Sequence, residues 1–310
     1  MFRRLKMKQI RYLGFFIVLS AVYWGGPALA EKRLALLVAN QDYAAAVGPL
    51  KNPFNDITRI SNALVAARFE VTIVRNAGQI ALLQAIDRYA ARIDEAGADA
   101  LSFFYYSGHG IASPSDHVNY LIPVDVTDMS DDTVWYKTVP LDRILDTLTK
   151  KAPDASHFVV FDACRNELHV RSNAKGEEEK SFAPMTGRNG QFIAFSTSPN
   201  QTASDKGDTG GPYAIALASE LTRQGQDHLA VFQNVRERVY EATRLSATPQ
   251  RPVEIGSLLH RVFFSSSGTP TRVNVPERTA ADVDRCLAAL DKNMSAANTI
   301  AAAKKCLNPS

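Results

Sequence analysis

The sequence predicts an α/β protein built on a mostly parallel six-stranded sheet with helices on both faces. Short apolar runs rich in β-branched and aromatic residues alternate along the chain with longer segments whose apolar residues recur at helical spacing. Two of these runs, 98–106 and 155–161, are apolar almost throughout, which is typical of parallel strands buried on both faces. With 310 residues, of which 45% are hydrophobic and 22% charged, the chain fits one large globular domain with appendages.

The first half of the domain is expected to contain three strands and two helices. In chain order they are strand 33–39, helix 54–67, strand 69–74, helix 79–95 and strand 98–106. Gly48-Pro49 and Asn52-Pro53 mark the stretch between the first strand and the first helix as a loop. The inner face of the first helix is expected to carry Ile57, Ile60, Ser61, Leu64 and Val65.

The second half is expected to contain the other three strands. The order is a loop-rich stretch 111–140, helix 140–150, strand 156–161, a polar segment 167–188, strand 191–196, helices 213–223 and 228–243, and strand 259–264. Pro, Leu and Asp in its first turn favour the start of the helix at residue 140. The charge density of 167–188 is typical of a mobile surface segment.

The first 30 residues have the features of a secretory signal peptide. A basic segment precedes an apolar stretch, 13–23, and Ala28-Leu29-Ala30 forms a small-x-small cleavage site. An uncleaved anchor is the alternative, although the stretch is short for the roughly 20 residues of a membrane span. Cleavage would lower the net charge from +3 to −2, so no nucleic-acid partner is expected. We expect a periplasmic or secreted protein without a membrane span after cleavage.

The carboxyl-terminal residues are expected to form appendages to the domain that covers 31–265. Residues 266–278 have linker composition, and the Ala-rich stretch 279–310 is expected to form a small helical hairpin. Cys286 and Cys306 are candidates for a disulfide in an oxidising compartment. That pairing would leave Cys164 as a free thiol.

Two of the expected strands end in residues that can perform covalent catalysis. One run leads into Asp162-Ala163-Cys164-Arg165-Asn166, and the other into Ser107-Gly108-His109-Gly110. If the runs are neighbouring parallel strands about 4.8 Å apart, their carboxyl ends bring a thiol and an imidazole together. These are a nucleophile and its base. The alternatives are a buried core cysteine and a histidine that merely sits in a Gly-rich turn.

These two motifs resemble those of the caspase family. Caspases carry Gln-Ala-Cys-Arg-Gly at the nucleophile, with the histidine about 50 residues upstream, and here His109 precedes Cys164 by 55 residues. Asp162, in place of the glutamine, is what metacaspases and their bacterial relatives carry. The resemblance covers roughly residues 32–265 and implies the caspase-like (caspase-hemoglobinase) fold.

The resemblance also implies roles for individual residues. Cys164 would be the nucleophile, and His109 would take its proton and return it to the leaving amine. The backbone N–H groups of Gly110 and Cys164 would form the oxyanion hole. The loop 197–211 resembles the family's substrate-groove loop. The segment 167–188 corresponds to the family's linker, and Arg171, Lys175 and Lys180 are candidate cleavage sites there if the enzyme prefers basic residues.

Substrate preference is expected to depend on an acidic pocket. By resemblance to metacaspases, Asp56, Asp162 and Ser107 would line it, and two carboxylates there attract the side chain of Arg or Lys. Asp56 could instead be a helix N-terminal acid that complements the dipole, and Asp162 a hydrogen-bonded acid at a strand end.

We expect no cofactor, and the alternative is that the protein binds calcium. Some metacaspases need calcium, and Asp131 and Asp132 fall in about the right place, but the accompanying ligand position is not matched. Motifs for zinc or for a nucleotide are absent from the sequence. The remaining histidines match no family motif and are expected to be structural or solvated; they are His117, His157, His169, His228 and His260.

The sequence therefore predicts a cysteine endopeptidase that acts on protein or peptide substrates after Arg or Lys. Two alternatives stay open. One is a catalytically silent binding or scaffold module with the same fold, and the other is a cysteine hydrolase whose acyl donor is not a peptide.

Overall fold

The computed structural model describes residues 31–113, 118–129, 133–164, 185–198 and 209–265. The expected signal peptide, the cleavage sites, Asp131 and Asp132, the linker, the hairpin with Cys286 and Cys306, His117 and His169 lie outside these ranges. Among the described residues, none of the helices has the length and apolar character needed to cross a membrane.

The described part of the chain contains strands and helices in mixed order. They are β1 (Arg33–Ala39), α1 (Pro53–Ala66), β2 (Glu70–Arg75), α2 (Gln79–Ala96), β3 (Leu101–Ala112), β4 (Asn119–Leu121), α3 (Val134–Lys137), β5 (Val139–Pro140), α4 (Leu141–Lys151), β6 (Ser156–Cys164), β7 (Gln191–Phe195), α5 (Pro212–Leu221), α6 (His228–Thr243) and β8 (Val253–Gly256).

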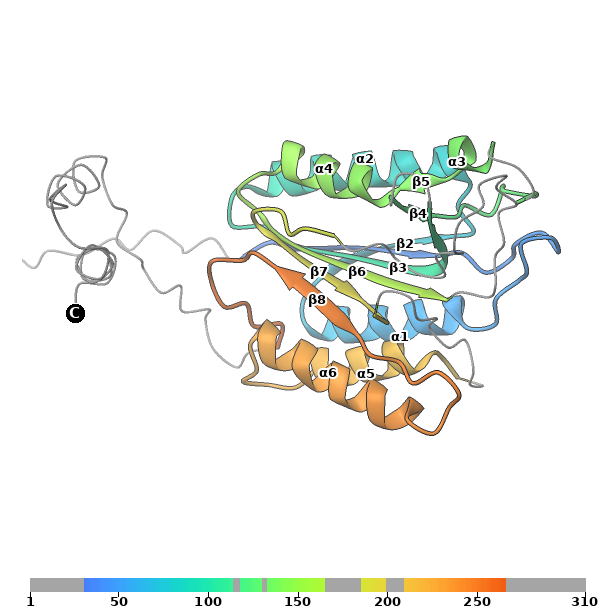
Figure 1. Ribbon diagram of the computed structural model, residues 1–310. Helices are drawn as coiled ribbons and strands as arrows, with labels where there is room; N and C mark the ends of the chain where they lie inside the picture. Colours follow the sequence, from blue (N-terminus) through green and yellow to red (C-terminus); the bar gives the residue numbers. More distant parts are fainter. Residues whose placement is uncertain (1–30, 114–117, 130–132, 165–184, 199–208, 266–310) are drawn as a thin grey trace, which may run out of the picture. The chain divides into compact units, whose positions relative to one another are not determined.

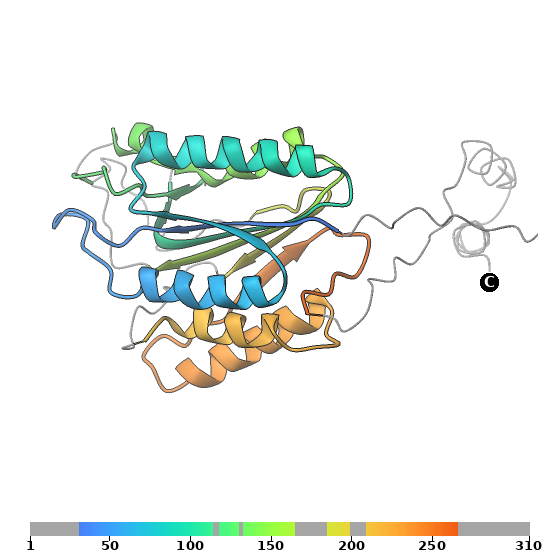
Figure 2. The ribbon, with the colours of Figure 1, turned by 180° about the vertical axis from the view of Figure 1, so that it is seen from behind.

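The main sheet has the strand order β2-β1-β3-β6-β7-β8. All of its pairings are parallel except that of β7 with β8. The short strands β4 and β5 extend from the end of β3 in antiparallel pairing. Helices α2 and α4 cover one face, and α1, α5 and α6 cover the other (Figures 1 and 2). The expected α/β class is confirmed, and the carboxyl ends of β1, β3, β6 and β7 share one edge.

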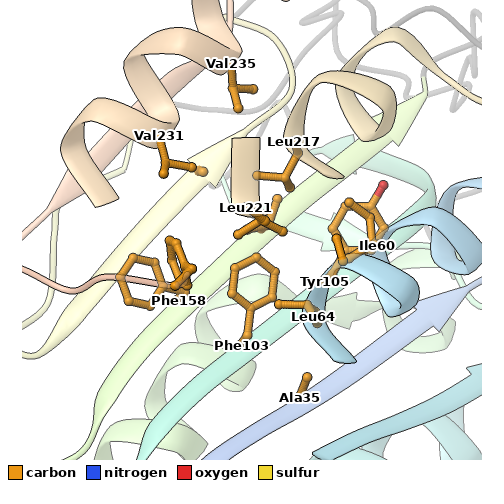
Figure 3. Packing of buried hydrophobic residues seen from close by; sticks show 14 of the residues in the cluster. Ala35, Ile60, Leu64, Phe103, Tyr105, Phe158, Leu217, Leu221, Val231 and Val235 are labelled. Carbon is orange, nitrogen blue, oxygen red and sulfur yellow. The ribbon is translucent and has the colours of Figure 1, made fainter. Parts of the chain in front are cut away.

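The core consists of two apolar layers, one on each face of the sheet, and a smaller third cluster that joins the loop after β1 to the region around β4. Along β3 the side chains alternate, so that Phe103 and Tyr105 pack toward α1 and α5, whereas Phe104 and Tyr106 pack toward α2 and α4. Figure 3 shows Phe103 and Phe158 beneath the apolar residues of α5 and α6. Every residue of β3 is buried. Each such aromatic side chain contributes roughly 1.5–3 kcal/mol, so the strand that carries the histidine is firmly held.

The two central strands are longer than the sequence pattern indicates. We expected them to end at Tyr106 and Phe161, but β3 continues through His109 to Ala112 and β6 continues to Cys164. The extension of β3 is possible because β4 provides an antiparallel partner for residues 110–112. The interpretation of His109 as part of a Gly-rich turn is therefore wrong, and the stretch 111–140 is not simply a loop.

The sixth strand of the main sheet is not where we expected it. Residues 259–264 form only an isolated bridge, between Phe263 and Asp227, and the strand is β8 instead. The apolar residues of 259–264 misled the prediction because two of them, Val262 and Phe264, fill the core beneath α6 without forming a strand. The short, partly exposed β8 carries the charged Glu254, as edge strands commonly do, and so lacks a strong apolar pattern.

Helix α1 lies within one residue of its expected range, but its buried face is shifted around the helix axis. Ile57, Ile60 and Leu64 are buried as expected, whereas Val65 is 58% exposed and Ser61 is half-buried. Ser61 and Val65 are spaced i, i+4 and lie on the same side of the expected stripe, whereas the opposite side is buried further, through Asp56 and Ala63.

Candidate active site

The strand register places His109 opposite Cys164. Strands β3 and β6 pair in parallel from Leu101 and Ser156 up to the pair His109 and Cys164. The expectation that the two segments are neighbouring parallel strands is thereby confirmed. Neighbouring strands lie about 4.8 Å apart, so the two residues are adjacent at the carboxyl edge of the sheet. The side chain of Cys164 lies outside the described part of the structure.

The imidazole of His109 is oriented by the loop that follows β1. Its Nε2 lies 2.8 Å from the carbonyl oxygen of Gly48, and the ring of Tyr43 packs on it with a centroid distance of 4.6 Å. A carbonyl oxygen only accepts hydrogen bonds, so Nε2 carries the proton in this contact. In the neutral ring, Nδ1 is then the basic nitrogen, and the Gly48 contact stabilises the ring when it becomes protonated.

Two tyrosine hydroxyls hold the backbone of His109. The His109 N–H donates to the hydroxyl of Tyr43 at 2.9 Å, and the Tyr106 hydroxyl donates to the His109 carbonyl at 2.8 Å. Gly108 makes this packing possible, because a Cβ there would lie 2.7 Å from both hydroxyl oxygens. Sequence reasoning missed both tyrosines, since Tyr106 reads as core and Tyr43 belongs to no periodic pattern.

A buried asparagine joins three segments beneath the histidine. Asn40 is fully buried directly after β1. Its side-chain oxygen accepts from the Ala77 N–H at 2.8 Å, and its side-chain amide donates to the carbonyls of Ala77 and Ile122 at 3.3 Å each. Ile122 in turn donates its N–H to the His109 carbonyl at 3.0 Å. A polar residue at the end of an apolar strand was the available signal for this role.

The amide of Gly110 is directed toward the β6 side of β3. Gly110 pairs with Leu121 of β4, and the bond from the Ile122 N–H to the His109 carbonyl flanks that pair. This pattern marks a pair whose own N–H and C=O groups point away from each other's strand. On that side, β3 pairs with β6 up to His109 and Cys164, so Gly110 follows directly after the last residue pair of these two strands. The oxyanion role of Gly110 and Cys164 stays a prediction.

Asp56, Ser107 and Asp162 lie close together, with Ser107 and Asp162 two residues before the pair of His109 and Cys164 in the register of β3 and β6. Asp56, buried in the first turn of α1, accepts from the Gly211 N–H at 2.7 Å and from the Ser107 hydroxyl at 3.1 Å. Ser107 lies opposite Asp162 in the register of β3 and β6. Asp162 is buried as well and accepts from the hydroxyl of Tyr105 at 2.8 Å.

Both alternative interpretations of the acids describe part of this geometry. Asp56 does lie in a first helical turn, and Asp162 is hydrogen-bonded at a strand end. Their described bonds nevertheless run between α1, β3, β6 and the start of α5, so the two carboxylates converge on one place. Their effect on a neighbour is visible: burial raises the pKa of Tyr105 well above its usual range, and the charges of Asp162 and Asp56 raise it further.

The buried histidines outside this site have structural roles, as expected. The ring of His157 accepts from the Ser102 hydroxyl through Nδ1 at 3.0 Å and donates from Nε2 to the Ala152 carbonyl at 2.9 Å. His228 accepts from the Val262 N–H through Nδ1 at 3.2 Å. Burial lowers the pKa of both rings.

His157 should make the protein less stable in weak acid. Because its pKa is lower in the folded chain than its ordinary value of 6.5, the unfolded chain binds the proton more readily, and stability falls as the pH drops below about 6.5. We expect His157→Gln to be less stable at pH 7.5 and to lose stability less steeply between pH 7.5 and 5.5. The difference in slope is at most about 1.4 kcal/mol per pH unit. Urea unfolding at three pH values measures it, and equal slopes would contradict the prediction.

The described residues offer no group of three or more His, Cys, Asp or Glu side chains that could hold a metal ion. Because Asp131 and Asp132 lie outside those residues, the calcium alternative stays a prediction.

At the carboxyl edge of this α/β sheet, a histidine lies in register with a cysteine, the residue types of a base and a nucleophile. The chain belongs to the caspase domain family, whose model matches residues 32–264.

Two solved structures share the fold. The crystal structure of caspase-1 from Spodoptera frugiperda is 16% identical, with a TM-score of 0.56, and the match covers 78% of this chain and 92% of that chain. The structure of pro-sf-caspase-1 is 17% identical, with a TM-score of 0.58, and the match covers 85% of this chain and 98% of that chain. At these identities the similarity shows the fold alone. No curated protein matches the chain.

Proposed function

We propose that this protein is a cysteine endopeptidase that cleaves peptide bonds after Arg or Lys, as metacaspases do. The observation that carries the proposal is the register of β3 and β6, which sets His109 against Cys164 beside the buried acids Asp56 and Asp162. A silent binding module would have no need for an imidazole whose ring and backbone are both fixed.

The proposed reaction follows from the protons that Cys164 and His109 can donate and accept. Nδ1 of His109 accepts the thiol proton of Cys164, and the thiolate attacks the carbonyl carbon of the substrate. The tetrahedral intermediate collapses when the imidazolium returns the proton to the leaving amine, which leaves an acyl group on Cys164. A water molecule, deprotonated by the same nitrogen, then releases the carboxylic acid product and restores the thiol.

The pocket explains the choice of a basic side chain. Asp56 is held by Gly211 and Ser107, and Asp162 by Tyr105, so both carboxylates are fixed before substrate binds. A guanidinium group binds fixed carboxylates through paired, charge-assisted hydrogen bonds. An aspartate side chain would instead meet two like charges.

We propose further that residues 1–30 direct the chain to the periplasm or out of the cell.

A peptide panel tests the function. The chain from residue 31 on should cleave fluorogenic peptides that carry Arg or Lys before the scissile bond, and it should spare the matched Asp peptide, under reducing conditions with and without calcium. Cys164→Ala should abolish the cleavage. Cleavage of the Asp peptide alone would contradict the pocket argument, and the absence of all cleavage would favour the binding module.

A further inference from the structure

We propose that Tyr213 determines specificity: its hydroxyl accepts a hydrogen bond from the cationic side chain of the substrate. This inference rests on the proposed function, because it assigns a third acceptor to the pocket of Asp56 and Asp162.

The first observation is an unsatisfied hydroxyl. Tyr213 lies in the first turn of α5 and is 1% exposed. Among the described residues, its hydroxyl is the one tyrosine hydroxyl that is buried without a hydrogen-bond partner. The other buried tyrosines with described bonds use theirs: Tyr89 donates to the Leu34 carbonyl, and Tyr105 donates to Asp162. A buried hydroxyl without a partner is costly and indicates a ligand or a water molecule.

The second observation is the place of this residue. The N–H of Gly211, two residues before Tyr213, donates to Asp56, so the start of α5 is bonded to one of the two acids of the proposed pocket. Burial raises the pKa of the Tyr213 phenol, the charge of Asp162 raises it further, and the charge of Arg236 lowers it. The phenols of Tyr213 and Tyr105 also interact electrostatically. The start of α5 is thus bonded to Asp56, and the charge of Asp162 acts on the phenol of Tyr213.

The chemistry of the proposed substrate supplies the missing partner. A guanidinium has five N–H donors in one plane, and a single bidentate carboxylate uses two of them. The remaining donors need acceptors in a buried pocket, and a phenol oxygen beside the carboxylates is one. The ammonium of Lys has three donors on a compact head. Loss of the hydroxyl should therefore reduce the cleavage of Arg peptides more than the cleavage of Lys peptides.

The decisive variant is Tyr213→Phe, which removes the oxygen and keeps the ring. We expect kcat/KM for the Arg peptide to fall by about 10- to 100-fold, with a smaller fall for the Lys peptide. The thermal midpoint should not fall, since the free chain loses only an unsatisfied hydroxyl. A residue with a purely structural role would show the opposite pair of results.

Tyr89→Phe is the matched control. Tyr89 is equally buried, but it lies on the other face of the sheet and its hydroxyl is bonded. Its replacement should lower the thermal midpoint and leave kcat/KM unchanged. An unchanged kcat/KM for the Arg peptide in Tyr213→Phe would overturn the inference while the endopeptidase proposal stands, as expected if a water molecule fills the site.

A binding measurement separates the two proposals. Benzamidine carries an amidinium that mimics the head of the Arg side chain, and calorimetric titration into Cys164→Ala measures its binding without turnover. We expect Tyr213→Phe in that background to weaken the binding by a similar factor. If benzamidine binding depends on Tyr213 but the chain with Cys164 intact cleaves no peptide, the inference is supported and the endopeptidase proposal is rejected. Equal binding by both chains would overturn the inference.

Discussion

Replacing His109 with alanine is expected to lower kcat/KM on an Arg peptide by about 10³-fold or more. The reason is that the residue opposite Cys164 in the β3 and β6 register supplies the only proposed route for the thiol proton and for the proton of the leaving amine. Stopped-flow or steady-state kinetics with the fluorogenic Arg peptide measure the decrease in kcat/KM. Because the two residues act as a unit, the double variant with Cys164→Ala should be no slower than Cys164→Ala alone.

His109→Gln separates the base from its surroundings. The glutamine amide offers an N–H for the Gly48 carbonyl, which His109 contacts at 2.8 Å, yet it accepts no proton near neutral pH. We expect it to lose as much activity as His109→Ala while its thermal midpoint stays closer to that of the parent chain. Activity within tenfold of the parent in either variant would remove His109 from the mechanism.

Asp162→Asn is expected to reduce kcat/KM for Arg and Lys peptides by about a hundredfold, which corresponds to roughly 3 kcal/mol. The substitution removes the charge but keeps an oxygen that can accept from the Tyr105 hydroxyl, now 2.8 Å from the carboxylate. A substrate cation would then enter a pocket with one carboxylate instead of two. Kinetics with Arg, Lys and neutral peptides of one sequence measure the effect, and the neutral peptide should be cleaved at an unchanged rate.

Asp142→Asn provides the control for this charge change. Asp142 is a half-exposed carboxylate of α4 that pairs with Arg188 at 2.8 Å, and its replacement removes one negative charge from another part of the domain. Exposed or half-exposed pairs contribute little, so activity should be unaffected. An equal loss on all three peptides in Asp162→Asn would show that the acid supports the strand end rather than recognises the substrate.

The sequence predicted that the two central strands are parallel neighbours and that the two motifs stand at their ends. It could do so because fully buried parallel strands leave continuous apolar runs, such as β3 and β6, and because Cys164 and His109 stand out after such runs. The end of β3 was expected too early because the partner of residues 110–112 is β4, a three-residue strand without a pattern of its own. The end of β6 was expected too early because its last residues, up to Cys164, pair with the polar and glycine residues 107–109 of β3. The strand β8 was missed because it is short and lacks a strong apolar pattern.

The supporting residues of the site could not be predicted in this way. The roles of Asn40, Tyr43 and Tyr106 depend on contacts with Ala77, Ile122 and His109 that the fold creates across long stretches of chain. In the sequence, Tyr105 and Tyr106 are simply part of an apolar run. Tyr213 shows no signal either, because an unsatisfied hydroxyl is a property of packing and becomes visible only when its surroundings are known.

The loop after β1 and the start of α1 form one continuous stretch that contributes both to the orientation of His109 and to the expected substrate preference. Gly48 orients the imidazole, and a few residues later Asp56 enters the acidic pocket. An insertion or deletion between Gly48 and Asp56 would displace both residues. A change of this kind that alters the cleavage preference would therefore also disturb the imidazole of His109. For protein engineering, residues 40–56 are best exchanged between relatives as a single cassette.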